Sequence, residues 1–246
     1  MTSNACVEEK TTAAASKEAA SIADKTTTDL ELVEVFKQRA ANYGFLSRLY
    51  REEIDMALLE ELHAMHYRVS SGNEDVDEGY RLIATYLCGI WENTPIELAA
   101  DYMRVFFGHG YNGHAAAYPF ESVYTSEKRL LMQGARDEVL ALYRAAGLEK
   151  QESWKEGEDH IALELEYMQI LANRSASALD AGDEDEAVAL VRSQQNFLDD
   201  HLMGWVPMMT VEMKKFARTD FYRGLAYLTD GLLSNDKELL DNMLSE

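Results

Sequence analysis

Apolar residues recur at helical spacing along most of this 246-residue chain. Segments 54–67 and 76–91 carry them on one face, and the clearest early set is spaced by three, four and seven residues: Leu32, Phe36, Tyr43, Leu46 and Tyr50. Such spacing is typical of helices with a buried face, and β-branched runs between turn signals are few. The sequence therefore predicts an all-α fold, a single helical domain of about nine helices.

A fourth helix has the best-marked start. Thr94 is expected as its N-cap, Pro95 as its first helical residue, and Glu97 as the acid that completes a capping box. The helical pattern then stops near Gly108. Residues 108–125 are rich in glycine and aromatic residues and too long for a routine connection, so they predict a binding surface or a structural wrap. They could also divide the domain into two helical subdomains, or act as a hinge for exchange between chains.

The second half of the chain predicts further helices. The segment that follows Asp159 carries apolar residues on two stripes, so it is expected to be a central helix covered on more than one side. Asp183 is expected to cap the next helix, with Glu186 three residues later. Trp205 and Pro207 are read as a tight re-entry between helices. The remaining predicted helices cover 126–146, 208–217, 220–233 and 238–244.

Composition and charge narrow the possible partners. Residues 1–27 are almost free of large apolar groups and are expected to form a disordered tail, which leaves 28–246 as the folded domain. A net charge of −21 argues against nucleic acid, because phosphate binding needs clustered Lys and Arg. The same charge would attract a cationic partner, although it also serves solubility.

The two cysteines and the apolar runs indicate a cytoplasmic protein. Cys6 and Cys88 make no disulfide framework and no CxxC metal motif, which fits a reducing compartment. No apolar run approaches the ~18 residues of a membrane span, and the N-terminus lacks the pattern of an export signal. Neither membrane insertion nor export is expected.

Motifs that would carry catalysis or hold a metal are weak. Glu60 and His63 form one Glu-x-x-His pair, whereas a dimetal centre needs two. The acidic run near Asp180 lacks the ligand order of a calcium loop, and no phosphate-binding glycine motif or nucleophile elbow is present. No catalytic residue, metal or cofactor is assigned, although a helical metal-binding protein or enzyme that uses His and carboxylates is the alternative.

The pair Asp159-His160 is the most distinctive candidate. Adjacent helical residues point about 100° apart, so the two cannot work as a catalytic dyad. Spacing alone predicts that Asp159 caps the helix, while His160 lies exposed in the first turn within reach of Glu164.

The residues around this pair carry a family resemblance. The stretch EGEDHIALELEYM resembles the E-P-x-D-H-x-x-x-x-L-x-F/Y-M motif of the TorD/DmsD family of molybdoenzyme chaperones. Further matching stretches occur in the right order between positions 29 and 233: ELAADYMRVFFG, ESVYTSEKRLLMQGA, FLDDHLMGWVP and FYRGLAYLT.

The resemblance implies a cytoplasmic, non-enzymatic chaperone of anaerobic respiration. It would bind the twin-arginine signal peptide of a molybdopterin-dependent reductase catalytic subunit and assist cofactor insertion and maturation before export. It would be a monomer or a homodimer, the latter in some relatives formed by exchange of helices.

The resemblance also implies the binding residues: Glu156, Glu158, Asp159, His160, Pro119, Phe120 and Tyr124. Two positions depart from the family. Gly157 stands where the motif has proline, and Phe120 stands where some members have tryptophan. If φ at Gly157 is near −65°, a Gly157→Pro substitution is expected to stabilise the fold by roughly 0.4–1 kcal/mol.

Overall fold

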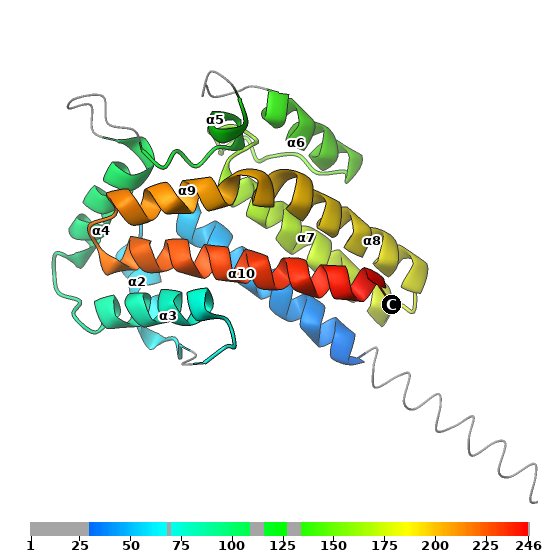
Figure 1. The fold of residues 1–246 in the computed structure, drawn as a ribbon, viewed down its shortest axis with the longest axis horizontal. Coiled ribbons are helices and arrows are strands. Elements are labelled where there is room, and N and C mark those ends of the chain that lie inside the picture. The colour runs from blue at the N-terminus through cyan, green and yellow to red at the C-terminus, as the bar shows by residue number, and fades with distance from the viewer. Residues whose placement is uncertain (1–29, 68–69, 109–115, 127–133, 246) are drawn as a thin grey trace, which may run out of the picture.

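The computed structural model describes residues 30–67, 70–108, 116–126 and 134–245, and the tail expected over 1–27 lies outside them. Within the described ranges the regular structure is helical and contains no strand, which confirms the all-α prediction (Figure 1). The subdomain division and hinge predicted around 108–125 remain predictions, since residues 109–115 also lie outside the described ranges.

A first helix covers residues 30–51. The elements that follow are α2 (Met56–Ala64), α3 (Glu74–Leu87), α4 (Thr94–Tyr102), the π-helical segment η1 (Met103–Phe107), α5 (Glu121–Thr125), α6 (Gly134–Ala145), α7 (Ile161–Asp180), α8 (Glu184–Phe197), the π-helical segment η2 (Leu198–Leu202), α9 (Met203–Phe216) and α10 (Asp220–Ser245). None of these described helices combines the length and apolar character that a membrane crossing requires.

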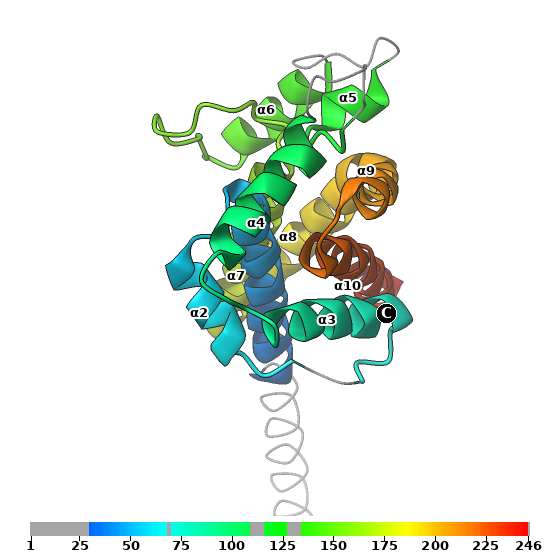
Figure 2. The ribbon, with the colours of Figure 1, turned by 90° about the vertical axis from the view of Figure 1, so that its left-hand side faces the viewer.

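Helices α7 and α10 lie at the centre of the domain. Twelve of the 20 residues of α7 are buried, which confirms that it is covered on more than one side. Figure 1 shows α9, α10 and α3 in successive rows, and Figure 2 shows α5 and α6 together at one end of the molecule. The hydroxyl of Ser47 donates to the carbonyl of Ala162 at 2.7 Å, which ties the first helix to the start of α7.

The start of α4 differs from the prediction. Asn93, not Thr94, is the N-cap residue, and it makes no side-chain capping bond. The hydroxyl of Thr94 instead accepts from the backbone N–H of Trp91 at 2.8 Å, while Glu97 accepts from the hydroxyl of Tyr86. The expected capping box is therefore wrong, because both side chains bond outside the helix. Trp91 is 59% exposed and lies beyond the end of α3, contrary to its predicted place on the buried face.

The expected re-entry at Trp205 and Pro207 is also wrong. Segment η2 joins α8 to α9 without a turn, and both residues lie inside α9. A proline removes only one helical hydrogen bond, and the buried side chains of Trp205 and Val206 hold the helix to the core on that turn.

A second break was predicted between 233 and 238, yet α10 runs through it. Within this polar stretch Asp236 faces inward, where it accepts from Arg39 Nε at 2.5 Å, Arg39 Nη2 at 2.8 Å and the Tyr43 hydroxyl at 2.6 Å. Arg39 Nη1 also donates to Gln194 at 2.7 Å. One residue of the stretch that looked like a connection thus belongs to the buried ion pair between the first helix and α10, and its polar neighbours lie on the outer side of the same helix.

Helices α3 and α10 approach each other through glycines. A methyl group on Gly224 would lie 2.8 Å from the carbonyl oxygen of Gly79, and one on Gly231 would lie 2.6 Å from the backbone nitrogen of Val76. Both distances are shorter than the normal contact distance between a methyl carbon and an oxygen or nitrogen atom. In both cases the obstructing atom belongs to the backbone. The close contact of the two helices therefore requires the absence of a side chain at these positions.

We expect Gly224→Ala to lower the free energy of unfolding by about 1–3 kcal/mol, because α3 and α10 must move apart. The matched control is Gly204→Ala in α9, where no atom lies within 4 Å of the added methyl group. There the helix preference of alanine should raise stability by about 0.4–1 kcal/mol. Urea unfolding of both variants measures the difference, and an equal effect of the two substitutions would contradict the steric contact.

Candidate functional site

The two segments singled out by the sequence meet at the start of α7. Phe120 and His160 form an isolated antiparallel bridge. The N–H of Glu121 donates to the carbonyl of Asp159 and the N–H of Ile161 donates to the carbonyl of Pro119, each at 3.0 Å. The structure therefore brings Pro119, Phe120, Asp159 and His160 together, although about 40 residues separate the two pairs.

His160 is the N-cap of α7, and its side chain is buried. Its Nδ1 accepts from the N–H of Ala162 at 3.1 Å. The ring packs edge-on between Phe120 and Trp154, with centroids 5.0 and 5.1 Å away. Burial, aided by the positive charge of Arg51, lowers the pKa of His160 to about 3, so the ring is neutral at pH 7. The expectation that His160 is exposed is wrong.

Asp159 does not cap α7 as expected, because its side chain turns toward the other segment. It has no exposed surface, and Oδ2 accepts from the N–H of Ser122 at 3.0 Å. A Cβ atom at Gly157 would lie 2.7 Å from Asp159 Oδ1. A side chain at the motif position that departs from the family would therefore require the Asp159 carboxylate to move, and the stabilisation expected from Gly157→Pro stays a prediction.

The remaining acids of the motif differ in exposure. Glu158 is buried and paired with Arg136 and with Lys150, whose Nζ lies 3.0 Å from Oε1. Burial alone would raise the pKa of Glu158, but hydrogen bonds from both cations outweigh it and lower the pKa to about 2. Glu156 is exposed. Of the three predicted acids, it alone presents its side chain to solvent.

A buried polar group beneath the motif was not found by sequence reasoning. His201 Nδ1 lies 3.0 Å from Glu121 Oε2, and the indole N–H of Trp205 donates to Glu164 at 3.1 Å. Burial and the charge of Glu121 raise the pKa of Glu164, which favours its neutral form. Tyr124, half-buried, stacks on Trp205 with centroids 5.6 Å apart. The sequence feature that could have indicated this buried polar group is Glu164 itself, because its carboxyl lies between two apolar stripes of a central helix.

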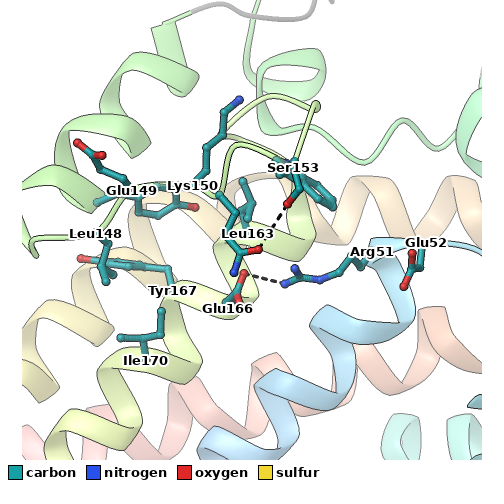
Figure 3. Close-up of a pocket in the computed structure, with 13 residues that line it drawn as sticks. Arg51, Glu52, Leu148, Glu149, Lys150, Ser153, Leu163, Glu166, Tyr167 and Ile170 are labelled. Carbon is teal, nitrogen blue, oxygen red and sulfur yellow. Dashed lines mark hydrogen bonds and ion pairs between the residues drawn. The ribbon is translucent and has the colours of Figure 1, made fainter.

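A pocket of about 450 Å³ opens beside the motif, between the loop before α7, the end of the first helix and α7 itself (Figure 3). Apolar and aromatic side chains form much of its wall, and acids lie among them. Its lining residues are Arg51, Glu52, Tyr143, Leu148, Glu149, Lys150, Gln151, Ser153, Trp154, Leu163, Glu166, Tyr167 and Ile170. An apolar lining with a few charged groups, here three acids and two cations, is typical of a ligand pocket.

None of the seven predicted site residues is among those that line this pocket. Trp154, which packs on His160, lies in the pocket wall, whereas Asp159 and His160 have almost no exposed surface. Their direct contact with a peptide stays a prediction. Among the described residues no group of three or more His, Cys, Asp and Glu could hold a metal ion, and Glu60 and His63 lie exposed on α2.

Comparison with known proteins gives consistent matches. The nitrate reductase delta subunit family matches residues 71–211, which include both segments of the motif. Chaperone protein TorD of Vibrio cholerae serotype O1 is 26% identical over 222 residues, covering 88% of this chain and 98% of the relative. The TorD chaperone of Photobacterium profundum is 29% identical over 199 residues, covering 78% of this chain and 88% of the relative. The TorD chaperone of Shewanella pealeana is 27% identical over 235 residues, covering 89% of this chain and 97% of the relative.

The steric contact at Gly157 predicts that Gly157→Ala lowers the free energy of unfolding by about 1–3 kcal/mol. Because the obstacle is the Asp159 carboxylate, Asp159→Ala should remove part of this loss when the two substitutions are combined. A double-mutant cycle in urea measures the coupling. Strictly additive effects would show that the two residues do not press on each other.

The low pKa of His160 predicts a loss of stability in mild acid. The unfolded chain binds a proton at this residue below about pH 6.5, whereas the folded chain does not bind it until about pH 3. Stability should therefore fall as pH drops through this window. Between pH 7 and pH 5 the loss attributable to His160 is about 2 kcal/mol.

The control variant for this pH dependence of stability is His160→Asn, because asparagine can still cap a helix but does not titrate. Urea unfolding of both proteins at pH 7 and pH 5 isolates the residue, because every other group titrates in both. Parallel pH dependence of the two proteins would show that His160 gains its proton in the folded state as easily as in the unfolded one.

Proposed function

Because the chain belongs to the nitrate reductase delta subunit family, and its similarity to TorD chaperones extends over most of its length, we propose that it is a chaperone for the catalytic subunit of a molybdopterin-dependent reductase. Its relatives are named as chaperones, a non-enzymatic role. In this proposal it works in the cytoplasm, holding the client until its cofactor is inserted and it can be exported.

The client segment in this proposal is the twin-arginine signal peptide. Such a peptide presents two adjacent guanidinium groups followed by an apolar, helix-forming segment, so its receptor needs carboxylates beside an apolar surface. The observation that supports the proposal is the composition of the pocket at the motif. Leu148, Leu163 and Ile170 provide apolar wall, while Glu149 and Glu166 provide carboxylates among them (Figure 3).

The apolar segment carries most of the affinity in this arrangement. The carboxylate of Glu166 is 36% exposed, and an ion pair at that exposure contributes about 1 kcal/mol or less. Burial of apolar area contributes roughly 25 cal/mol per Å², which soon exceeds such a pair. The net charge of −21 acts at longer range, because it raises the rate at which a cationic peptide arrives.

The seven motif residues have two kinds of role in this proposal. Glu156 and Tyr124, which are exposed and half-buried but do not line the pocket, touch the peptide where it extends beyond the pocket. The buried residues position the pocket wall that contacts the peptide: Glu158, Asp159, His160, Pro119 and Phe120. Substitution of a buried member would therefore weaken peptide binding by moving Trp154 and its loop.

The test is calorimetric titration with a synthetic peptide that carries paired arginines before an apolar segment, and with its paired-lysine counterpart. We expect the lysine peptide to bind about tenfold more weakly, because ammonium groups cannot form the planar, bidentate contact of guanidinium. Binding of the arginine peptide should weaken as salt rises, since its charge contribution is screened. Equally poor binding of both peptides at low salt would reject the proposal.

A matched pair of variants tests the place of binding. Glu149→Gln removes a carboxylate from the pocket lining, and Glu138→Gln removes an exposed one from α6 that is not part of the lining. Both change the net charge by one unit. We expect about threefold weaker binding for the first and a smaller change for the second, which reports only the long-range attraction.

A further inference from the structure

One arginine of the chain itself already lies in the pocket. Arg51, at the end of the first helix, donates from Nη2 to Glu166 Oε2 at 2.7 Å. Its guanidinium carbon lies 5.5 Å from the ring centroid of Trp154. Figure 3 shows Arg51 pointing to Glu166 from the opposite wall of the pocket.

These contacts match what a guanidinium group requires. A carboxylate oxygen accepts its N–H, and its central carbon lies over an aromatic face, which combines a charge-assisted hydrogen bond with a cation–π contact. An ammonium group could take the first contact but would stack less well. The side chains around Arg51 are therefore better suited to a guanidinium group than to an ammonium group.

Arg51 can be displaced from its carboxylate partner, in contrast to Arg39, which is also paired with a carboxylate. Arg39 is 4% exposed and its partner Asp236 is 8% exposed, so that pair holds the core together. Arg51 and Glu166 are 32% and 36% exposed. Solvent reaches both groups, and separation of the pair leaves neither charge buried without water.

We infer that Glu166 and Trp154 form the subsite for one arginine of the bound peptide, and that Arg51 is an internal ligand which the peptide displaces. This inference rests on the proposed function. Glu52 and Glu149, exposed acids at opposite ends of the same pocket, are the candidate partners of a second guanidinium group (Figure 3). A ligand must gain enough binding free energy to displace Arg51. A cation without an attached apolar segment gains too little to do so.

The first test measures binding of the paired-arginine peptide to Arg51→Gln. Removal of the internal competitor should tighten binding about tenfold. The control is Arg48→Gln, which removes the same charge one turn earlier on the same helix, where Arg48 pairs with the exposed Glu61 outside the pocket. The control should stay within about twofold of the wild type, since it changes only the net charge.

The gain in Arg51→Gln should disappear when Glu166→Gln is added, because the subsite then lacks its carboxylate. Equal affinity of the wild type and Arg51→Gln for a peptide that does bind would overturn the inference and leave the proposed function intact. A gain that persists in the double variant would also overturn it, since Glu166 would then play no part.

A second test does not need the peptide. In Arg51→Ala, ethylguanidinium should occupy the vacated place and shift the indole N–H resonance of Trp154, which is assigned by comparison with Trp154→Phe. We expect saturation at concentrations on the order of millimolar, with ethylammonium at least about fivefold weaker. An unchanged Trp154 resonance would reject the subsite. If no peptide binds to any variant but this shift is seen, the proposed function and the displacement of Arg51 by a peptide both fail, and only a guanidinium site at Glu166 and Trp154 stands.

Discussion

The antiparallel bridge between Phe120 and His160 fixes where α7 begins, and the pocket depends on that point. With two backbone hydrogen bonds made across the bridge, His160 is held where its ring can cap the helix. The preceding loop must then pass over the first turns of α7, which lays Trp154 against His160 on one side and against Arg51 on the other. A small element of backbone pairing thus determines the shape of a wall made almost entirely of side chains.

Carboxyl groups inside this acidic protein are stabilised in three different ways. Asp236 is neutralised by an arginine, and Asp101 accepts from the backbone N–H groups of Arg218 and Thr219. For Glu164, burial near another acid raises the pKa and favours the uncharged form. The electric field outside the protein therefore comes mainly from the exposed acids. The acids that attract a partner are largely different residues from the buried acids that the fold must stabilise.

Helices with a clear apolar period, such as the central α7, could be predicted from the sequence, and so could the cap at Asp183, whose side chain accepts from Glu186 N–H. The errors have a common cause. The cap expected at Thr94 and the break expected before residue 238 were inferred from local polarity, whereas the polar groups there bond to distant or neighbouring segments.

For the candidate site, the sequence identified the two segments but not their burial. Pairing of Phe120 with His160 is a tertiary event that no spacing along the chain encodes, and it turns residues expected at the surface into support. Arg51 could not be predicted for the same reason. It lies more than 100 residues from Trp154 and Glu166, and nothing in its own segment distinguishes it from Arg48.

The buried pair of Arg39 and Asp236 also has a consequence for the time at which the protein can fold. The two residues are 197 positions apart, and the bond joins the first described helix to the last. During synthesis, Arg39 leaves the ribosome long before its carboxylate partner exists, and α3 must wait for the glycines of α10 in the same way. Segments made early therefore remain without their native cover until residue 236 has emerged, so that the core closes as a late step of translation.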